Sequence, residues 1–572
     1  MKKSSESTFK DISAKYPERQ SAVMPIMQLL QKENSNRFEA GSIDTVAKAL
    51  GMSRSRVYGI STYYTMFNTH PVGRYHLQVD TCVPGFLHGA DEIVEHLCKK
   101  LGIAVGGTTV DGMFTLTTVQ DLASCATGPV IQVNEVYYEN MTVEKTDQLI
   151  DALNKGKKYS SDTSMNVVSE CGILLNDRTD KNCRKLAYYR KRGGYRTLEK
   201  AIKLKPEDIV NEVKEAQLRG RGGAGFPAGM KWSFLPKNDT RPVYLICNAD
   251  EGEPGTFKDR QIMEFNPHLL VEGIAISAYA IKSRKSFIYI RGEFAWIADI
   301  LETAIDEAKT AGLLEHVDII VHRGGGSYVC GDETAQIESL EGKRGNPRVK
   351  PPFPANSGLY GCPTVVNNVE TLSNVPYIIE HGAAAYKKIG TTNNHGPKIF
   401  GISGHVNKPG VFEYPLGTKL SVLLDAAGGV KGNLKGVIVG GLSVAILTAS
   451  EAKDLALDYE SCQKAGTALG SGGIIVINQT VSIPELALRT IEFYHHESCG
   501  QCVPCREGSH VIEQKLRALL KGRGTLADID LILYLCENIR GLTLCPTGEA
   551  FSVPIHAMIT KYRPEFESLA KQ

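Results

Sequence analysis

The sequence predicts a multidomain protein of mixed α/β class, and three observations support that prediction. The chain has 572 residues, more than a single hydrophobic core organises, so we expect roughly three to five domains. Between residues 200 and 380, apolar strands alternate with amphipathic helices, which is typical of a mostly parallel sheet with helices on its faces. Both ends of the chain have the apolar period of helices instead.

Composition excludes several classes of protein. Hydrophobic residues make up 42% of the chain and charged residues 22%, an ordinary globular mixture. The 65 Lys and Arg nearly balance the 63 Asp and Glu, so no strong field indicates a nucleic-acid or membrane partner. No apolar run reaches the roughly 18 residues of a membrane span, and the N-terminal stretch lacks the apolar core of a signal peptide. We therefore expect a cytoplasmic protein with no nucleic-acid partner and no direct membrane insertion.

Five segments follow one another along the chain. Residues 1–150 hold helices and then a compact unit of short strands and helices, whereas residues 151–184 are predicted to be a polar linker. Residues 185–390 form the α/β domain. Short strands and Gly-rich turns around one helix make residues 391–482 a small α+β module, and residues 483–572 are helical again.

Four cysteines near the C-terminus form the most specific motif. Two residues separate Cys499 from Cys502 and Cys502 from Cys505, and Cys545 follows after 39 intervening residues. Three closely spaced thiolates and a remote fourth suit a [4Fe–4S] cluster, because the chain can wrap around one small body. The alternative is a zinc site with four cysteine ligands, which normally uses two separated CxxC pairs.

A glycine-rich loop, LRGRGGAGFPAGMKW, is the second motif. Gly220, Gly222 and Gly225 match the dinucleotide fingerprint GxGxxG, but the segment before them is helical, whereas a Rossmann turn follows a strand. Successive glycines let backbone N–H groups approach a phosphate or the edge of an isoalloxazine ring, and Arg221 or Lys231 can neutralise the anion. We therefore favour a flavin or nucleotide phosphate over a plain turn.

Acidic and amide side chains crowd the end of the predicted strand VYLI. Asn248, Asp250, Glu251 and Glu253 follow this strand directly, at the edge where open α/β sheets place ligands. Such groups suit ribityl or ribose hydroxyls, and a carboxylate facing a ribose disfavours a 2′-phosphate, which favours NAD over NADP. The alternatives are a metal site and a solvated acidic turn.

A second glycine-rich segment, GGGSYVCGDETAQIESLEGKRGNPRVKPPFP, again joins glycines after a strand to acidic residues. Phe353 lies in its proline-braced loop, as an exposed ring that stacks on a base would. A phenylalanine buried in the core is the alternative.

At these motifs, residues 185–572 resemble the flavin-carrying, NADH-oxidising 51 kDa subunit of respiratory complex I and related soluble diaphorases. The shared motifs are RGRGGAGFP with GMKW, NADEGEPGTFKDR, SYVCGDET, PTVVNNVET and ESCGQCVPCREG. Residues 10–150 resemble the thioredoxin-like iron–sulfur neighbour of that subunit, through RVYGISTYYTMFNTHPVGRYHLQV, GADEIVEHL and VIQVNEVYYEN. The fusion of the two resembles the diaphorase subunit of NAD-reducing hydrogenases.

The resemblance implies the folds and the cofactor ligands. It implies a thioredoxin-like domain after the N-terminal helices, a Rossmann-like FMN and NADH domain, a ubiquitin-like β-grasp module and a helical bundle around the [4Fe–4S] cluster. The residues implied to hold FMN are Gly220, Arg221, Gly222, Lys231, Asn248, Asp250, Glu251, Tyr328, Gly331, Asp332, Asn367 and Asn368. Those implied to hold NAD(H) are Phe226, Phe234, Glu253, Glu333, Lys350 and Phe353. No side chain is implied to act as acid or base, because FMN performs hydride transfer.

The resemblance also implies the function. FMN would exchange hydride with NADH and single electrons with the [4Fe–4S] cluster, inside a multisubunit soluble redox complex. The implied partners are a 24 kDa-like [2Fe–2S] subunit, an iron–sulfur electron-transfer subunit and the catalytic subunit of a hydrogenase or formate dehydrogenase. The alternatives are the NADH dehydrogenase module of complex I and a non-catalytic electron-transfer or assembly subunit.

One departure from the family pattern lies in the fourth motif. The family usually has two glutamates before the threonine, whereas this chain has Asp332 and Glu333. The side chain of Asp332 is one methylene shorter, which would retune the flavin potential, change the fit of the nucleotide or have no effect.

The larger departure lies in the N-terminal domain. The four positions expected to hold [2Fe–2S] ligands carry one thiol, and a further cysteine lies nearby: Asp80, Gly85, Asp121 and Cys125, with Cys82 close to the first pair. Glycine offers no ligand, and a carboxylate is a poor substitute for a thiolate on iron. We therefore expect no [2Fe–2S] cluster in this domain, which would remain as a scaffold and docking surface.

Overall fold

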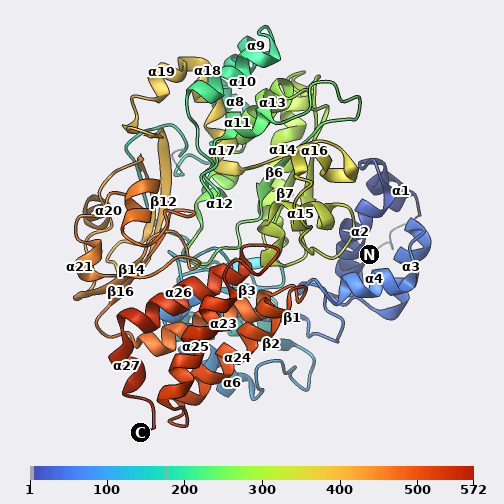
Figure 1. Ribbon diagram of the computed structural model, residues 1–572. Coiled ribbons are helices and arrows are strands. Elements are labelled where there is room, and N and C mark those ends of the chain that lie inside the picture. Colours follow the sequence, from blue (N-terminus) through green and yellow to red (C-terminus); the bar gives the residue numbers. More distant parts are fainter. Residues whose placement is uncertain (1–5, 176–177, 572) are drawn as a thin grey trace.

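The structure, a computed structural model, describes residues 6–175 and 178–571, and its parts surround a central α/β domain (Figure 1). Four helices open the described chain and lie at the right of Figure 1, beside the central domain. They are α1 (Glu6–Ala14), α2 (Val23–Glu33), α3 (Ala40–Leu50) and α4 (Arg54–Ser61). The helical period predicted for this part of the chain is confirmed.

A thioredoxin-like unit follows these helices. Its elements are β1 (Tyr75–Asp80), α5 (Val83–Leu87), α6 (Ala90–Leu101), β2 (Phe114–Val119), β3 (Ile131–Val133), β4 (Val136–Tyr138) and α7 (Val143–Asn154). The strand order is β2-β1-β3-β4, with β1 parallel to β2 and antiparallel to β3. The apolar faces of α6 and α7 pack on the sheet and bury a separate core.

The central domain contains a four-stranded parallel sheet of β6 (Tyr244–Ala249), β7 (Lys285–Ile290), β8 (Asp318–Arg323) and β9 (Thr364–Asn368). Its order is β8-β7-β6-β9, so the chain progresses outward from β6 and then returns to the other side of that strand. The strand order therefore reverses between β6 and β9. In open α/β sheets, ligands bind outside the carboxyl ends of the strands at such a reversal.

Helices surround this sheet. Before β6 come α8 (Leu186–Lys191), α9 (Arg196–Ala201), α10 (Pro206–Glu215) and α11 (Ala228–Ser233). Between the strands lie α12 (Lys258–Phe265), α13 (Pro267–Ala280), α14 (Ala295–Thr310), α15 (Glu333–Leu340) and α16 (Pro354–Ser357). After β9 come α17 (Val369–Ser373), α18 (Val375–His381) and α19 (Ala383–Tyr386).

The N-terminal helices cover one face of the central sheet. Successive strand residues point to opposite faces, and alternate residues of β6 and β7 enter two different cores. One set shares a buried cluster with residues of α1–α4: Tyr244, Ile246, Phe287 and Tyr289. The other set packs with α13 and α14: Leu245, Cys247, Ile288 and Ile290.

A six-stranded mixed sheet with the order β15-β14-β16-β12-β13-β5 forms the third unit. Its elements are β5 (Asn166–Ser169), β12 (Pro397–Gly404), β13 (Gly410–Pro415), α20 (Leu420–Ala426), β14 (Leu434–Ile438), β15 (Leu447–Thr448) and β16 (Gly473–Asn478). The edge strand β5 lies within the segment predicted to be a linker and pairs in parallel with β13. Sequence reasoning missed it, because a four-residue strand has too short a pattern to distinguish from a loop.

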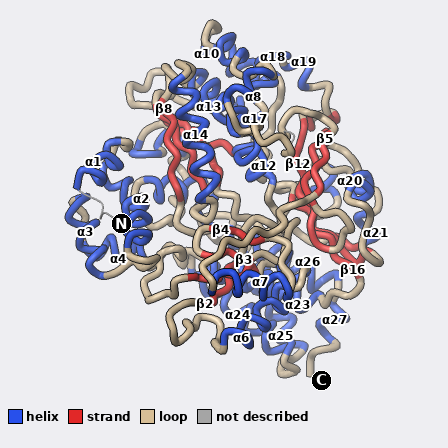
Figure 2. Tube along the Cα trace, turned by 180° about the vertical axis from the view of Figure 1, so that it is seen from behind, coloured by secondary structure: helices blue, strands red, loops and turns tan. Residues whose placement is uncertain are grey.

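Four long helices follow this sheet, and the short α27 (Arg563–Glu567) comes after them: α23 (Ile483–Glu497), α24 (Val503–Leu520), α25 (Leu526–Ile539) and α26 (Thr547–Lys561). They bury a shared core, and Ser482 and Thr525 cap the first turns of α23 and α25. Seen from behind, the thioredoxin-like strands lie next to these helices (Figure 2). No helix within the described residues is long and apolar enough to span a membrane.

Candidate flavin and iron–sulfur sites

The glycine-rich loop connects α10 to α11 and lies beside the carboxyl end of β9. A side chain at Gly222 would place its Cβ 3.0 Å from the Cβ of Asn368, and one at Gly225 would lie 2.4 Å from the ring of Tyr459. The Tyr459 hydroxyl donates a hydrogen bond to the Gly220 carbonyl at 2.8 Å. Glycine is therefore required here for close approach, and the loop lies at the switch point of the sheet.

Arg221 is fully buried within this loop. Its Nη2 donates to the Tyr386 hydroxyl at 3.1 Å and to the His395 carbonyl at 2.7 Å, whereas its Nε and Nη1 have no hydrogen-bond partner. Buried donors without a partner are costly, so they fit an anion or a tightened contact with Tyr459. The assignment of Arg221 to the flavin phosphate remains a prediction.

Lys231, on α11, connects the glycine loop to the fourth motif. Its Nζ donates to Glu333 Oε2 at 2.9 Å and to the Val366 carbonyl at 3.1 Å. The ammonium of Lys350 lies 3.1 Å from the other oxygen of Glu333. Burial opposes ionisation of Glu333, but the two lysines lower its pKa below the ordinary value. Three of the predicted ligands are thus brought together.

Asn248 occupies the carboxyl end of β6. Its amide donates to the Gly331 carbonyl at 2.9 Å, and its Oδ1 accepts from Gln336 Nε2 at 2.9 Å. Space remains around Gly331, because a Cβ there would meet only the Asp250 carbonyl, at 3.6 Å. The buried Asp250 Oδ2 and Gln336 Oε1 have no partner, and burial raises the pKa of Asp250 well above its ordinary value. Open space beside unpartnered polar atoms fits a polar cofactor such as FMN.

Two residues that sequence reasoning did not select contribute here. Gln336 holds Asn248, and the Trp232 indole Nε1–H donates to Asn367 Oδ1 at 2.8 Å. Both lie within the quoted motifs, Gln336 four residues after Asp332 and Trp232 directly after Lys231. Nearness to those predicted ligands was the only signal that could have found them.

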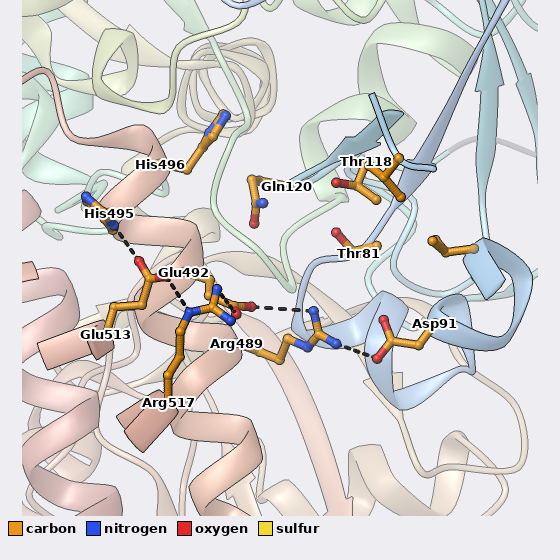
Figure 3. A pocket seen from close by; sticks show the side chains of 12 residues that line it. Thr81, Asp91, Thr118, Gln120, Arg489, Glu492, His495, His496, Glu513 and Arg517 are labelled. Carbon is orange, nitrogen blue, oxygen red and sulfur yellow. Dashed lines mark hydrogen bonds and ion pairs between the residues drawn. The ribbon is translucent and has the colours of Figure 1, made fainter. Parts of the chain in front are cut away.

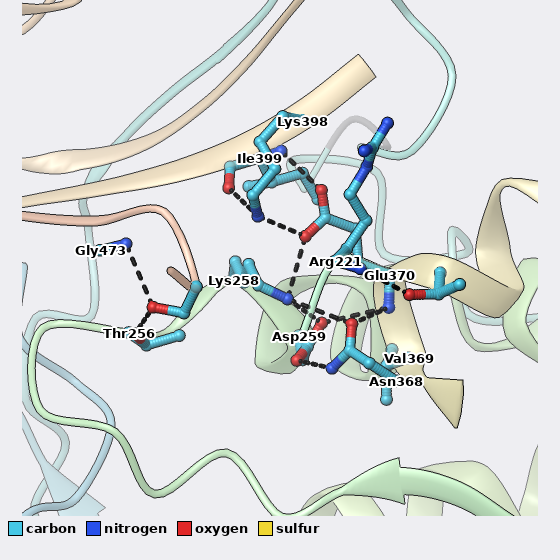
Figure 4. A network of polar contacts seen from close by, with 12 residues as sticks. Arg221, Thr256, Lys258, Asp259, Asn368, Val369, Glu370, Lys398, Ile399 and Gly473 are labelled. Carbon is cyan, nitrogen blue, oxygen red and sulfur yellow. Dashed lines mark hydrogen bonds and ion pairs between the residues drawn. The ribbon is translucent and has the colours of Figure 1, made fainter. Parts of the chain in front are cut away.

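A buried network of charges lies behind the glycine loop (Figure 4). Lys258 Nζ lies 2.7 Å from Asp259 Oδ1 and 2.9 Å from Glu370 Oε2, and Lys398 Nζ lies 2.7 Å from the same oxygen of Glu370. Asn368, a predicted FMN ligand, donates to Asp259 Oδ2 at 2.6 Å. Burial lowers the pKa of Lys398 to about 7, because an ammonium loses its hydration there. The network fastens β12 to the end of β9.

The two glutamates of the acidic loop have different surroundings. Glu251 accepts from the backbone N–H groups of Asp259 and Arg260 at 2.8 and 2.9 Å, so it caps the first turn of α12. Glu253 accepts from the Tyr328 hydroxyl and the Ser443 backbone, both at 2.7 Å. Burial raises the pKa of Glu253. Both carboxylates are thus already hydrogen-bonded within the protein.

The three predicted adenine-binding rings are exposed, which is unusual for phenylalanine. The exposed fractions are 44% for Phe226, 54% for Phe234 and 54% for Phe353. The ring centroids of Phe226 and Phe234 are 6.0 Å apart with planes tilted by 45°. Within the described part of the chain, no ring contact joins Phe353 to either of them. The buried-core alternative for Phe353 is therefore excluded, and its stacking on a base remains a prediction.

The four cysteines of the C-terminal motif gather between helix ends. Cys499, Cys502 and Cys505 lie in the turn from α23 into α24, and Cys545 precedes α26. The Leu544 backbone N–H donates to Cys502 Sγ at 3.4 Å. No three of the four sulfurs lie within 4.8 Å of one another in the described structure, a wider spacing than a single ion requires. A [4Fe–4S] cubane takes four thiolates that lie farther apart than the ligands of one ion.

The cysteine cluster lies next to the predicted flavin segment. The Tyr328 backbone N–H donates to Glu497 Oε2 at 2.9 Å, which ties the fourth motif to the end of α23. Burial raises the pKa of Cys545, and the negative charge of the nearby Asp332 adds to the rise. Asp332 also caps α15, because its Oδ1 accepts from the backbone of Thr334 and Ala335. This cap gives a structural role to aspartate at a position where the family usually has glutamate.

The thioredoxin-like domain brings two thiols and one carboxylate together where its [2Fe–2S] ligands would be expected. A side chain at Gly85 would lie 2.5 Å from the Asp80 carbonyl, so no thiolate could occupy that position without backbone movement. The Arg291 guanidinium contacts Asp121 at 2.8 Å, and the sulfurs that lie near this carboxylate are those of Cys82 and Cys125. A [2Fe–2S] cluster usually takes four ligands, mostly thiolates.

A cavity of about 770 Å³ separates the thioredoxin-like domain from the C-terminal helices (Figure 3). Its wall is charged: Arg489 pairs with Asp91 across the gap, and Arg517 lies 2.6 Å from Glu492. A smaller cavity of about 270 Å³ is lined by residues of the thioredoxin-like sheet, by Asp250 and by Tyr328. The first cavity lies outside the predicted flavin site, and the second touches its edge.

The fold and these sites define a flavin- and iron–sulfur-binding oxidoreductase. Comparisons with known proteins agree in each part of the chain. Residues 213–377 match the Nuo51 FMN-binding domain, and residues 485–569 match the NADH-ubiquinone oxidoreductase-F iron-sulfur binding region. Residues 9–154 match the thioredoxin-like [2Fe-2S] ferredoxin family, and residues 399–441 match the SLBB domain.

The chain belongs to the family of F-type subunits of NADH-quinone oxidoreductase. It is 48% identical to one such protein of Rhizobium meliloti (strain 1021) over 406 residues, which cover 69% of this chain and 96% of the relative. It is 47% identical to the corresponding protein of Rickettsia felis over 394 residues, covering 67% and 93%. The resemblance expected from the motifs is confirmed.

A solved structure matches nearly the whole chain. The NAD+-reducing [NiFe]-hydrogenase in its H2-reduced state contains a chain that superposes with a TM-score of 0.87 at 30% identity. The match covers 96% of this chain and 93% of that one, so it includes the thioredoxin-like domain. The expected fold class is confirmed.

Proposed function

We propose that this chain is the NAD(H)-converting flavoprotein subunit of a multisubunit redox complex. When bound, FMN exchanges hydride with NADH and single electrons with an iron–sulfur centre. The observation that carries the proposal is the contact between the two sites. The segment of Tyr328 and Asp332, which we assign to the flavin pocket, hydrogen-bonds Glu497 at the end of α23, and the charge of Asp332 acts on Cys545 of the [4Fe–4S] region. Such a subunit requires a short distance between FMN and the [4Fe–4S] cluster, because single electrons must pass from one to the other.

The residues of the chain would bind and orient the cofactors. Lys231 and the glycine loop would hold the charged end of FMN, and Asn248, Asp250 and Gly331 would line the space for its polar groups. The exposed rings would stack on the adenine of NAD(H), with Glu253, Glu333 and Lys350 nearby. Cys499, Cys502, Cys505 and Cys545 would hold the [4Fe–4S] cluster.

The host complex is proposed from the full-length structural match. A hydrogenase- or formate-dehydrogenase-type complex in the cytoplasm would supply an iron–sulfur electron-transfer subunit and a catalytic subunit. A NADH dehydrogenase module of complex I is the second candidate, because the F-type relatives match 67–69% of the chain at 47–48% identity. A separate 24 kDa-like [2Fe–2S] subunit would join either complex.

We further propose that the thioredoxin-like domain binds no [2Fe–2S] cluster. Its donor set supports this, since Gly85 leaves no room for a ligand and Arg291 occupies one side of Asp121. The family match of residues 9–154 then reflects the fold of the domain.

The test combines cofactor quantitation with an anaerobic NADH titration of the purified full-length chain. We expect about one FMN and about four irons per chain, bleaching of the flavin absorbance and a paramagnetic reduced cluster. Lys231→Ala should lower FMN retention, whereas Lys237→Ala, an exposed control in the same segment, should not. Flavin that NADH fails to bleach would favour an assembly role, and about six irons would contradict the missing cluster.

A further inference from the structure

We propose that Cys82, Asp121 and Cys125 form a site for one soft divalent cation of the zinc class in the thioredoxin-like domain. Among the residues that the structure describes, this is the one group of His, Cys, Asp or Glu whose ligand atoms all lie within 4.8 Å of one another. All three side chains are buried, with exposed fractions of 2%, 6% and 2%. Three buried ligand atoms that face one another are the core of a metal site.

A shared carboxylate fixes the two loops that carry these ligands. Asp80 Oδ1 accepts from the Cys82 backbone N–H at 2.9 Å, and Asp80 Oδ2 accepts from the Leu122 backbone N–H at 3.0 Å. The end of β1 and the loop that follows β2 are therefore held together by one residue. The ligand atoms are positioned before any cation binds, which reduces the entropy lost on binding.

The spacing and chemistry of the donors suit zinc. Cys125 Sγ lies 3.9 Å from Asp121 Oδ1. Zinc–sulfur and zinc–oxygen bonds of about 2.3 and 2.1 Å in a tetrahedron place such atoms about 3.6 Å apart, so little movement is needed. Thiolates favour zinc over magnesium or calcium. Two sulfurs suffice for one zinc ion, whereas they do not suffice for a two-iron cluster.

Arg291 of the central domain acts as the outer partner of this site. Its Nη1 donates to Asp121 Oδ2 at 2.8 Å and its Nη2 to the Asp121 carbonyl at 2.7 Å, which leaves Oδ1 toward the thiols. Metal-bound side chains are commonly oriented by such a second contact. The guanidinium and a dication together bring three positive charges to the two thiolates and to the two neighbouring carboxylates, Asp80 and Asp121. Asp121 also lines the 270 Å³ cavity, which is large enough to hold water beside this carboxylate.

A cation here would cross-link the thioredoxin-like domain at its contact with the flavin domain. The loop that carries Asp121 and Cys125 also carries Ser124, which hydrogen-bonds Arg260 of α12. The cation would therefore stabilise the surface on which the flavin domain rests. This inference does not depend on the proposed redox function.

The test measures zinc and iron per chain by mass spectrometry of the elements, on full-length holoprotein produced with zinc in the medium and desalted with a weak chelator. We expect about one zinc beside about four irons. Cys82→Ser and Cys125→Ser should each lower zinc at least fivefold without changing flavin or iron content. Cys98→Ser, a partly exposed thiol in the same domain, is the matched control and should retain zinc.

X-ray absorption at the zinc edge of the wild-type protein should show two sulfur neighbours and lighter oxygen or nitrogen neighbours. Because this measurement uses the wild-type protein, it tests the zinc ligands even if a variant fails to fold. Wild-type protein without zinc, zinc retained in both variants, or an intact mass 2 Da lower from a disulfide between Cys82 and Cys125 would overturn the proposal. None of these results bears on NADH oxidation, so the two proposals fail separately.

Discussion

The guanidinium of Arg260 lies 2.7 Å from the carboxylate of Glu139, and this pair joins α12 of the flavin domain to the thioredoxin-like domain. Both side chains are almost completely buried, with exposed fractions of 6% and 1%. Without Arg260, the buried Glu139 would keep the Ser124 hydroxyl as a partner but lose this cation, whereas Arg260 also lies 3.4 Å from Glu264. The pair thus favours this one arrangement of the two domains, because either charge would cost free energy if it were buried here without the other.

Arg260→Met should lower the free energy of unfolding by about 3–5 kcal/mol, because Glu139 would remain buried without its cation. Replacing both residues, Arg260→Met with Glu139→Leu, should recover most of that loss. Urea titration of the transition that includes this interface is the measurement. Lys282→Met, which breaks an exposed pair with Glu207, is the control and should cost under about 1 kcal/mol. Equal losses in the single and double variants would contradict this account.

Asp332→Ala should cost about 1 kcal/mol of stability, because the first turn of α15 would lose its side-chain cap. Asp332→Asn should retain most of the cap, whereas Asp332→Glu, the usual family residue, should lose it through its extra methylene. Thermal unfolding of the flavin-loaded chain measures the three variants. Full stability of Asp332→Glu would show that the shorter side chain is not selected for capping.

Phe353→Ala should raise the dissociation constant for NADH about tenfold and leave FMN retention unchanged, because a stacked ring contributes about 1–3 kcal/mol per base. Calorimetry with NADH on the flavin-loaded chain measures the first quantity and flavin fluorescence the second. Val349→Ala removes an exposed apolar side chain from the same loop and serves as the control. Equal effects on both ligands would refute the stacking role.

Cys502→Ala should remove about four irons per chain and preserve reduction of the flavin by NADH, because the cluster lies beyond the hydride-accepting site. Stopped-flow absorbance follows the flavin, and electron paramagnetic resonance follows the cluster. Cys536→Ala truncates a buried thiol of α25 that is not among the four and should keep its iron. Retention of a complete cluster in Cys502→Ala would show that another group replaces this ligand.

Stability should fall on acidification through His322, which is fully buried on β8 against the Tyr16 hydroxyl. Burial lowers the pKa of His322 to about 3. A lowered folded pKa means that the unfolded chain binds the proton first, so stability is complete above about pH 6.5 and is lost as the pH falls toward 3. At pH 4.5 this residue should cost about 2–3 kcal/mol relative to pH 7.5.

His322→Gln should flatten the dependence of stability on pH in that range relative to wild type, and the exposed His70→Gln should not. Urea titrations at pH 7.5 and 4.5 give the two differences. Parallel curves for wild type and His322→Gln would rule out His322 as the titrating group.

The sequence was sufficient to predict those features that depend on residues close together in the chain. The cysteine spacing predicted a cluster at the turn into α24, and the glycines of residues 220–225 predicted close backbone approach, because both patterns lie within a few residues. The helix before that loop correctly argued against a standard Rossmann turn. The alternation of strands and helices predicted the parallel sheet, since its strands are buried on both faces.

What the sequence could not predict depends on contacts between distant segments. Lys258 and Lys398 are 140 residues apart and meet on the same oxygen of Glu370, and no local pattern indicates such a meeting. Arg291 directly follows the strand β7, and nothing in the sequence around it indicates that it faces Asp121 of another domain. The strand β5 depends on pairing with β13, so its four residues read as a linker.

The placement of α1–α4 on the central sheet has a consequence for the flavin domain. A parallel sheet must be shielded on both sides, and here the opening helices are the second shield, over Tyr244, Ile246, Phe287 and Tyr289. Removing α1–α4 would expose those four side chains to solvent. The first segment is therefore part of the shield that the flavin domain needs for its own sheet.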